Sequence, residues 1–438
     1  MSVSPGRGLL AAVGAWTALA TAAVVFAPLW AVAAGAALVI VVLAAADAGL
    51  LARRPPLELH RQLPERAFLG RPARLELVLE NPSQAPVRAE VFDEWPRDLA
   101  SADPAFPDVR LGPGQRVVLE ATATPRVRGD RPLGRPLALE RSPLGLLRRR
   151  VAGPADAALP VYPDTSALLR PEALDPKRAL ALLGVKPARK RGEGMEFESL
   201  RDYVPGDDPR RVDWTATARR GRPVVRLHQH ERNHPVVIAL DASRLMAGRF
   251  AGRTKLDYAV DAALALAYAA LLSGDRIGMA LFDRAVLGFV PPGRRRRDLG
   301  EFVELLRPVQ PRIVEADFGA LAAALGARQR QRALLVVLTD FVEADARSFA
   351  APFSALARRH QVLLVAVRDR VYEDLGAEAE RPGDRIGLYR RIVLDDLLHE
   401  REVALARLRR QGIQTLDLLP AAITGPVLNR YLALRQAF

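Results

Sequence analysis

The chain has 438 residues, no cysteine and a formal net charge of +14, and half of its residues are hydrophobic. This length allows two or three domains, and the lack of cysteine excludes disulfides, thiolate zinc sites and a cysteine nucleophile. Only four of the 64 basic residues are lysines. Because such an arginine excess is typical of a GC-rich genome, the charge does not by itself indicate nucleic acid. A basic body equally suits an anionic membrane surface.

Residues 1–54 are predicted to form a transmembrane helical hairpin. The uncharged run 9–26 and the apolar run 30–51, interrupted only by Asp47, are each near the ~20 residues that span a bilayer core. Pro28 indicates a tight turn between them. Arginines flank the pair on one side: Arg7, Arg53 and Arg54. The positive-inside rule therefore predicts a cell inner membrane protein whose main body is cytoplasmic. A cleaved signal peptide is the alternative, although it needs only one apolar run.

Residues 55–165 are rich in proline and in short alternating runs, which indicates a small β-sandwich. The stretch "ARLELVLENPSQAPVRAEVFDEWP" predicts a strand, an Asn-Pro turn and a second strand. Further strands are expected in "GPGQRVVLEATATPRVRGD" and "RPLALERSPLGLLRRRV". No residue of this region is typical of catalysis, so we interpret it as a spacer or docking module.

Residues 234–438 alternate apolar runs with helical patterns, which predicts an α/β, Rossmann-like, mostly parallel sheet with helices on both faces. Strands are expected at 235–240, 276–282, 332–338, 361–367 and 413–419. Helices are expected at 254–274, 298–308, 316–328, 345–359 and 394–410. A loop is expected after the second strand, and its "GRRRR" run is interpreted as solvated, or else as a contact for lipid headgroups.

Four of the predicted strands run into an aspartate: Asp241, Asp283, Asp340 and Asp369. Ligands of open α/β sheets bind beyond the carboxyl ends of the strands, and carboxylate oxygens suit Mg²⁺. Aspartates after strands also cap helices or hold turns. We favour that structural role for Asp283 and Asp369.

The stretch "LRDYVPGDDPRRVDW" followed by "VVIALDASRLM" resembles the signature of the domain of unknown function 58 family. The resemblance covers roughly residues 190–430, and its C-terminal part is similar to a von Willebrand factor A domain. It implies a bacterial or archaeal protein that is associated with an AAA+ ATPase of the MoxR type. The biochemical role of the family is largely unestablished.

A von Willebrand factor A domain holds its ion through an Asp-x-Ser-x-Ser loop, a threonine from a second loop and an aspartate from a third. Asp241, Ser243 and Asp340 match three of these positions, but Leu245 replaces the second serine and no threonine lies between 255 and 338. The resemblance therefore implies a degenerate site, in which water would complete the shell of a weakly bound Mg²⁺. We favour the alternative, without a cofactor: Asp241 accepts backbone N–H groups and Ser243 bridges to Asp340.

The signature segment and linker, residues 166–233, combine acids, arginines and two aromatic residues. Pro205 and Gly206 predict a turn, and Asp207 or Asp208 is expected to cap a helix that starts at Pro209. The helix is expected to carry Arg210, Arg211, Asp213, Trp214 and Arg219. The run "RPVVRLHQHERN" is expected to join the main sheet as an edge strand.

Two interpretations of this segment compete. It braces the neighbouring domains through internal ion pairs, which avoids a desolvation penalty only if every charge is paired. Alternatively, its aromatic and arginine side chains dock a protein partner. The candidate partner-binding residues are Arg201, Tyr203, Asp207, Asp208, Arg210, Asp213 and Trp214.

One cluster remains, because His228, His230 and His234 share a face if their segment is extended. We interpret them as solvated, with a three-histidine zinc site as the alternative. The sequence contains no Gly-Lys-Ser/Thr phosphate loop, Gly-x-Ser-x-Gly elbow or His-Glu-x-x-His helix.

The sequence thus predicts a non-enzymatic, membrane-anchored cytoplasmic scaffold that binds a MoxR-type AAA+ ATPase, and no catalytic residue is assigned. A metal-dependent hydrolase using Asp241 and Asp340 is one alternative, although no general base can be named for it. A basic nucleic-acid-binding protein is the other, but its arginine runs lack interleaved aromatic residues.

Overall fold

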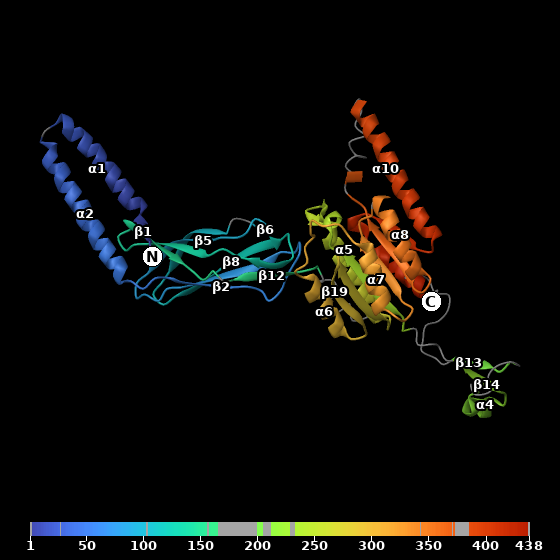
Figure 1. The fold of residues 1–438 in the computed structure, drawn as a ribbon. Helices are drawn as coiled ribbons and strands as arrows, with labels where there is room; N and C mark the ends of the chain where they lie inside the picture. Colours follow the sequence, from blue (N-terminus) through green and yellow to red (C-terminus); the bar gives the residue numbers. More distant parts are fainter. Residues whose placement is uncertain are drawn as a thin grey trace. The chain divides into compact units, whose positions relative to one another are not determined.

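The computed structural model describes residues 2–26, 28–101, 104–155, 157–164, 199–204, 212–227, 233–341, 343–369, 371–372 and 385–436. The chain divides into two compact units, Met1–Asp164 and Thr165–Phe438 (Figure 1).

Two long helices lie near the start of the first unit, α1 (Arg7–Val25) and α2 (Leu29–Arg53). Both are long and apolar enough to cross a membrane by length and composition. The indole N–H of Trp16 in α1 donates to the carbonyl of Ala33 in α2 at 2.9 Å, which ties the two helices together. Many of their large apolar side chains are exposed, among them Leu10, Val24, Val25, Leu38, Val39, Val41 and Val42.

The rest of the first unit is β-structure, as the alternating runs predicted. Its strands are β1 (Ser2–Pro5), β2 (Glu58–Gln62), β3 (Ala67–Phe68), β4 (Ala73–Glu80), β5 (Val87–Asp93), β6 (Leu99–Ser101), β7 (Ala105–Leu111), β8 (Arg116–Pro125), β9 (Gly129–Pro132), β10 (Pro136–Arg141), β11 (Leu147–Ala152) and β12 (Ala158–Tyr162). They form sheets of order β1-β11-β10-β5-β7, β2-β4-β8-β6 and β3-β12-β9. The first two share one apolar cluster, in which Leu77 and Leu79 of β4 pack with Val91 of β5.

The base of the helical pair is attached to the β-structure by buried polar contacts. Strand β1, just before α1, pairs antiparallel with β11. The fully buried Asp47 carboxylate of α2 accepts hydrogen bonds from the Ser142 hydroxyl and from the N–H groups of Leu144 and Leu146, the latter at 2.9 and 3.1 Å. The guanidinium of Arg149 in β11 donates to carbonyls at the end of α2, including that of Leu51 at 3.0 Å. Helix and hairpin turn therefore satisfy each other's polar groups.

The second unit contains a six-stranded sheet of order β19-β18-β15-β20-β21-β22. Its strands are β15 (Pro235–Asp241), β18 (Arg276–Phe282), β19 (Val286–Gly293), β20 (Leu334–Thr339), β21 (Gln361–Val367) and β22 (Gln414–Leu418). All neighbouring pairs are parallel except β18 with β19. The sheet confirms the prediction of a mostly parallel α/β sheet.

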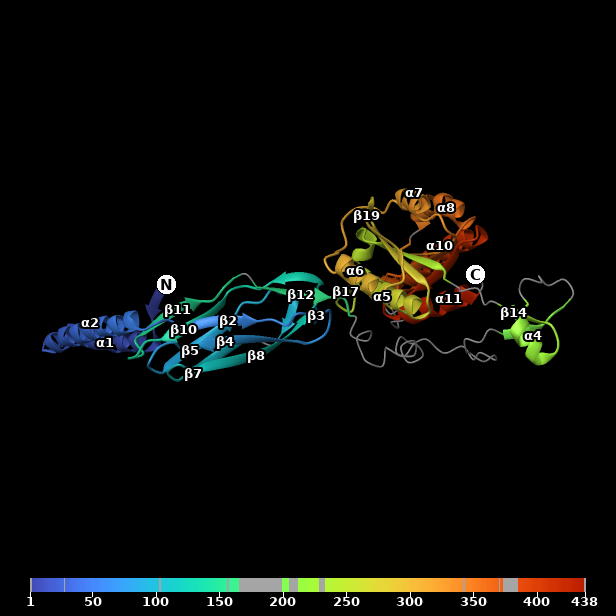
Figure 2. The ribbon, with the colours of Figure 1, turned by 90° about the horizontal axis from the view of Figure 1, so that it is seen from below.

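Helices cover both faces of this sheet (Figure 2). Alternate residues of β15 point to opposite sides: Ile238 packs in a cluster with α5 (Lys255–Leu272), α6 (Arg296–Leu306) and α11 (Thr424–Gln436). Val237 packs on the other side with α7 (Phe318–Arg328), α8 (Glu343–Ala357) and α10 (Arg385–Arg410). Every residue of β15 is buried, which explains its continuous apolar sequence.

Two elements around the six-stranded sheet differ from the sequence prediction. The expected loop after β18 contains the edge strand β19, and Arg296 and Arg297 of the "GRRRR" run belong to α6. A last helix, α11, was not predicted. It is attached through the buried Tyr431, whose hydroxyl donates to Asp275 at 2.6 Å.

Replacement of Asp47 by alanine is expected to loosen the β10–β11 turn, because three buried or partly buried donors lose their shared acceptor. A lost hydrogen bond to a charged group costs about 1.5–3 kcal/mol. Amide hydrogen exchange at Leu144 and Leu146 should therefore accelerate at least tenfold in the full-length, detergent-solubilised protein. The control is Asp108→Ala, because Asp108 forms an exposed ion pair with Arg110 on β7. Unchanged exchange in Asp47→Ala would show that this anchor does not hold the turn.

Candidate interaction site at the carboxyl edge of the sheet

The carboxyl ends of the parallel strands bring the predicted aspartates to one edge of the sheet. Asp241 ends β15, and Asp283, Asp340 and Asp369 follow β18, β20 and β21. Asp283 holds a turn by accepting the N–H of Ala285 at 3.2 Å, and it also pairs with Arg312 at 2.9 Å.

Asp241 accepts hydrogen bonds from its own loop and from the neighbouring strand. The backbone N–H and the hydroxyl of Ser243 donate to its two oxygens at 2.7 and 3.1 Å. The Thr339 hydroxyl at the end of β20 reaches it at 2.6 Å. Of the backbone N–H groups that were predicted to bond Asp241, that of Ser243 does so. The predicted bridge from Ser243 to Asp340 is wrong, because the hydroxyl of Ser243 bonds Asp241 instead.

The ammonium group of Lys255 lies between two carboxylates of this edge. Its Nζ is 2.5 Å from Asp340 Oδ2 and 2.6 Å from Asp369 Oδ2. Lys255 is the first residue of α5, whose N-terminus is fixed by a capping box between Thr254 and Asp257. The helix start therefore delivers a cation to the ends of β20 and β21. Asp369 is thus an ion-pair partner as well as the predicted turn residue, whose Oδ1 accepts the N–H of Val371 at 3.1 Å.

Arg401 of α10 extends this charge chain on the other side of Asp340. Its guanidinium lies 3.5 Å from Asp340 Oδ1 and donates to Asp417 Oδ1 of β22 at 2.9 and 3.0 Å. It also donates to the carbonyl of Phe341. Arg368 donates to the other Asp417 oxygen at 2.9 Å. Three cations thus face three carboxylates: Lys255, Arg401 and Arg368 against Asp369, Asp340 and Asp417.

These ion pairs determine the direction in which the pKa of Arg401 is shifted. Burial alone lowers the pKa of Arg401, but the hydrogen bond and charge of Asp417, together with the charge of Asp340, raise that pKa above its usual value. Buried charges are tolerated because each one has a hydrogen-bonded partner. The carboxyl edge is therefore a pre-paired polar network that fixes the ends of β20, β21 and β22 relative to α5 and α10.

The fit of a divalent ion to the predicted ligands Asp241, Ser243 and Asp340 depends on Lys255. Among the described residues, no three histidine or acidic side chains gather as a metal site. Asp340, the ligand expected from the third loop, already binds the Lys255 ammonium and the Arg401 guanidinium. A divalent cation beside these two positive charges would be repelled, so the residues present do not fit a bound Mg²⁺.

The first half of α10 exposes apolar side chains next to the charged edge. Arg401 donates to the carbonyl of Phe341, close to the carboxyl end of β20. The 16 residues of α10 that precede Arg401 have a length of about 24 Å at 1.5 Å per residue. They project away from the sheet (Figure 1). Leu388 and Tyr389 are 66% and 74% exposed there. Three more apolar residues lie on the same half of the helix and are also exposed: Ile392, Val393 and Leu397. An exposed cluster of this kind is typical of a contact surface.

The signature segment forms a small module within the second unit, made of β13 (Ser199–Asp202), α4 (Trp214–Arg220) and β14 (Val224–Leu227). β14, the described part of the run that was expected at the edge of the main sheet, pairs with β13 instead, so that prediction is wrong for Val224–Leu227. The helix begins at Trp214, later than predicted, because the Asp213 carboxylate caps it by accepting two N–H groups at 3.0 Å.

The structure describes four of the seven candidate partner-binding residues. Trp214 is 71% exposed at the start of α4, whereas Tyr203 is half-buried after β13 and Asp213 is the helix cap. Arg201 lies in β13. Asp207, Asp208 and Arg210 fall outside the described residues, as do His228 and His230 of the histidine cluster.

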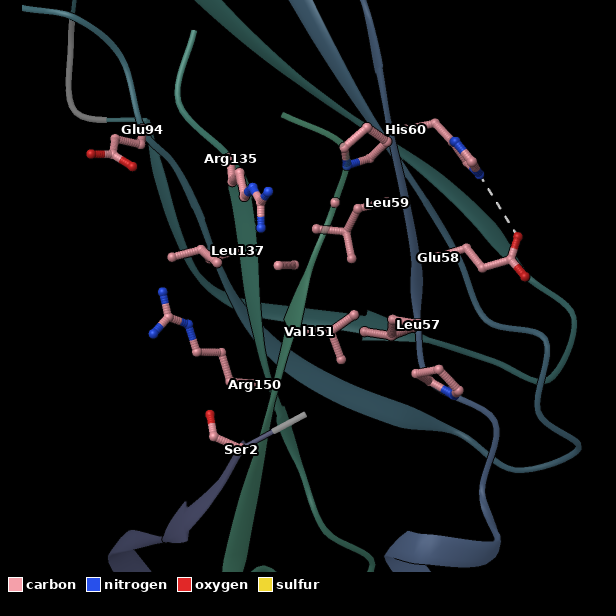
Figure 3. A pocket seen from close by; sticks show the side chains of 14 residues that line it. Ser2, Leu57, Glu58, Leu59, His60, Glu94, Arg135, Leu137, Arg150 and Val151 are labelled. Atoms are coloured by element: carbon pink, nitrogen blue, oxygen red, sulfur yellow. Dashed lines mark ion pairs between the residues drawn. The ribbon is translucent and has the colours of Figure 1, made fainter. Parts of the chain in front are cut away.

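A groove of about 870 Å³ lies in the first unit along β2, β10 and β11 (Figure 3). The side chains of Arg135 and Arg150 line it on one side. Glu58 and His60, 3.7 Å apart, line it on the other. Because both signs of charge border the groove, no class of ligand is favoured.

The fold and these sites define a chain with two long apolar helices, a β-rich region and a parallel α/β sheet whose charged edge is internally paired. Residues 199–384 match the model of the family described as "Protein of unknown function DUF58". Uncharacterized proteins of Mycobacterium tuberculosis and Mycobacterium bovis are each 29% identical to this chain over 231 residues, which is 49% of this chain and 72% of each relative.

Two solved structures show only slight likeness. The C-terminal part of native alpha-2-macroglobulin from Escherichia coli has a TM-score of 0.20 and 18% identity, covering 25% of this chain and 17% of that chain. The CARDB domain of a Pyrococcus furiosus protein has a TM-score of 0.15 and 16% identity, covering 24% of this chain and 98% of that chain. Likeness at these TM-scores supports no conclusion about this protein.

Replacement of Arg401 by methionine is expected to destabilise the carboxyl edge, because Asp340 and Asp417 lose a buried partner. Breaking a buried pair costs about 3–5 kcal/mol, and the remaining Lys255 and Arg368 favour the lower figure. Amide hydrogen exchange in β20 and β22 of the full-length protein measures the loss.

The matched control for this variant is Arg409→Met on the same helix. Arg409 pairs with Glu402 at 2.8 Å, but both side chains are about half exposed. Such a surface pair contributes only about 0–1 kcal/mol. Equal exchange in the two variants would contradict a special role for the buried network.

Proposed function

We propose that this protein is a membrane-anchored scaffold that binds a protein partner through its C-terminal unit. The partner that we infer is an AAA+ ATPase of the MoxR type, and the pair would act in the assembly or maturation of other complexes. The main observation behind this proposal is that the N-terminal half of α10 exposes apolar side chains. They lie beside the carboxyl edge of the sheet, whose charged side chains form ion pairs with one another.

Membrane insertion is supported by the two apolar helices and by their attachment. Their exposed leucine and valine side chains form a surface that water disfavours and that lipid tails accept. Because β1 precedes α1 and β2 follows α2 in the same compact unit, both outer ends of the helix pair lie on one side. Arg7, Arg53 and Arg54 lie at those ends, which favours the cytoplasmic face of the inner membrane.

We also propose that the six-stranded sheet and its helices form a von Willebrand factor A-like domain. The strand order β19-β18-β15-β20-β21-β22, with a single antiparallel edge strand, supports this assignment. So does the loop after β15, in which Asp241 and Ser243 are hydrogen-bonded. In such a sheet the carboxyl edge is the expected binding face, and that is where the exposed half of α10 projects.

Partner binding is supported by two exposed apolar features. Leu388 and Ile392 are one turn apart on α10, so one apolar groove can accept both. Trp214 offers a large aromatic anchor on the signature module. The class of partner comes from the resemblance of the "DYVPGDDPRRVDW" segment to proteins associated with MoxR-type ATPases. The hydrolase alternative requires Asp340 as an ion ligand, and that carboxylate is paired with Lys255.

Ile392→Glu and Trp214→Ala are each expected to weaken binding to a purified MoxR-type AAA+ ATPase about tenfold or more, because aromatic and aliphatic anchors dominate interface energies. Affinity would be measured with the full-length protein in detergent, with and without ATP. Both side chains are exposed, so the melting temperature should not change.

The control for this experiment is Leu287→Glu. Leu287 is an exposed apolar residue on β19, which is the outer strand of the sheet on the side away from β22. This variant should bind like the wild-type protein. Equal affinity for all four proteins would refute the proposed surface, and loss of folding in Trp214→Ala would instead favour a bracing role for α4.

The topology can be tested by labelling single cysteines, because the natural chain contains none. Pro28→Cys, between the two helices, should react with an impermeant maleimide on intact cells or spheroplasts. Pro113→Cys, in an exposed turn of the β-structure, should react only after the membrane is permeabilised. The reverse pattern would place the main body outside the cytoplasm.

A further inference from the structure

We propose that Lys255 is a built-in cation that takes the place of a divalent metal ion at the carboxyl edge. The edge would then keep its shape without metal, and removal of this ammonium group would create a binding site for Mg²⁺ or Mn²⁺. The proposal concerns the edge alone and does not depend on the identity of any partner.

The contacts of the ammonium group are those of a bound cation. Oxygens of Asp340 and Asp369, which follow two different strands, approach the same nitrogen at 2.5 and 2.6 Å. The side chains of Lys255 and Asp340 are 3% and 5% exposed, so water screens this pair poorly. A cation between the two loops offsets the repulsion that two neighbouring carboxylates would otherwise exert.

The position of Lys255 is built into the surrounding backbone. Its N–H donates to the carbonyl of Gly248 at 2.8 Å, and a Cβ at Gly248 would lie only 2.6 Å from Lys255 Cε. A side chain at position 248 would therefore displace the lysine stem. The capping box of α5 fixes the backbone of Lys255, and the absence of a side chain at Gly248 leaves room for its stem.

The oxygen atoms around Lys255 are those that a hard cation prefers. Asp340 and Asp369 supply two carboxylates, and Mg²⁺ is commonly held by one or two carboxylates with water completing its shell. Asp241 lies close by in the same network, because Thr339, the neighbour of Asp340, donates its hydroxyl to Asp241 at 2.6 Å. The lysine charge is thus the feature that excludes a divalent ion, and Arg401 alone would compete from only one side of Asp340.

The test compares full-length proteins in detergent by titration with Mn²⁺, followed by electron paramagnetic resonance of the free ion and by thermal melting. The wild-type protein is expected to show no saturable binding. Lys255→Ala is expected to bind one equivalent with a Kd on the order of 1 mM or tighter, and Mn²⁺ should raise its melting temperature. Lys255→Ala/Asp340→Asn should lose at least tenfold in affinity. Lys255→Arg, which keeps a cation, should resemble the wild-type protein.

Two results would overturn the proposal: wild-type protein that binds Mn²⁺ as tightly as Lys255→Ala, or a folded Lys255→Ala protein that binds none. If Lys255→Ala folds only when Mn²⁺ is present, the proposal is supported. If it does not fold under either condition, Lys255→Gln takes its place, because the glutamine amide keeps a hydrogen-bond donor at the edge without the charge. The same two outcomes then decide.

Discussion

The salt bridges of Lys255 with Asp340 and Asp369 are the interaction around which the carboxyl edge of the six-stranded sheet is arranged. Parallel strands converge at their carboxyl ends, and here they bring several acids to one edge. Without a cation between them, those acids would repel one another. A lysine at the start of α5 resolves this conflict from inside the chain, and its hydrogen bonds also join the helix on one face of the sheet to the loops after β20 and β21.

The same charge chain determines where the exposed part of α10 lies. Arg401 connects Asp340 to Asp417, so the middle of α10 is held between β20 and β22. Its C-terminal half buries Leu405 and Leu408 against the sheet. The N-terminal half has no such packing for Leu388 and Tyr389, which remain exposed. The ion pairs of Arg401 hold α10 in place, and its exposed apolar half extends beyond them. Such a preformed surface can bind a partner without first paying the entropy of folding.

Much of the second unit could be predicted because its strands are uniformly buried: β15, β20 and β21 are continuous apolar runs, and the helices between them are periodic. β19 escaped prediction because Pro291 and Pro292 suggest a loop, although proline is compatible with an edge strand. At the site, Asp241 and Asp340 were found from their places after strands. Lys255 was missed because a lysine that begins a helix is normally solvated. The one available signal is that Lys255 is the only lysine after residue 190 in an arginine-rich chain.

The attachment of α2 to the β-structure has a mechanical consequence. Asp47 lies within the helix and accepts hydrogen bonds from the β10–β11 turn. Arg149 donates to carbonyls at the end of the same helix. These two attachments lie just over one helical turn apart, so they restrict rotation and sliding of α2 against the strands. In a bilayer, a change in hydrocarbon thickness is usually absorbed by helix tilt. If α2 crosses a membrane as proposed, its contacts with Ser142, Leu144 and Leu146 would couple its tilt to the orientation of the β10–β11 turn, so a thinner or thicker bilayer would tilt the adjoining strands as well.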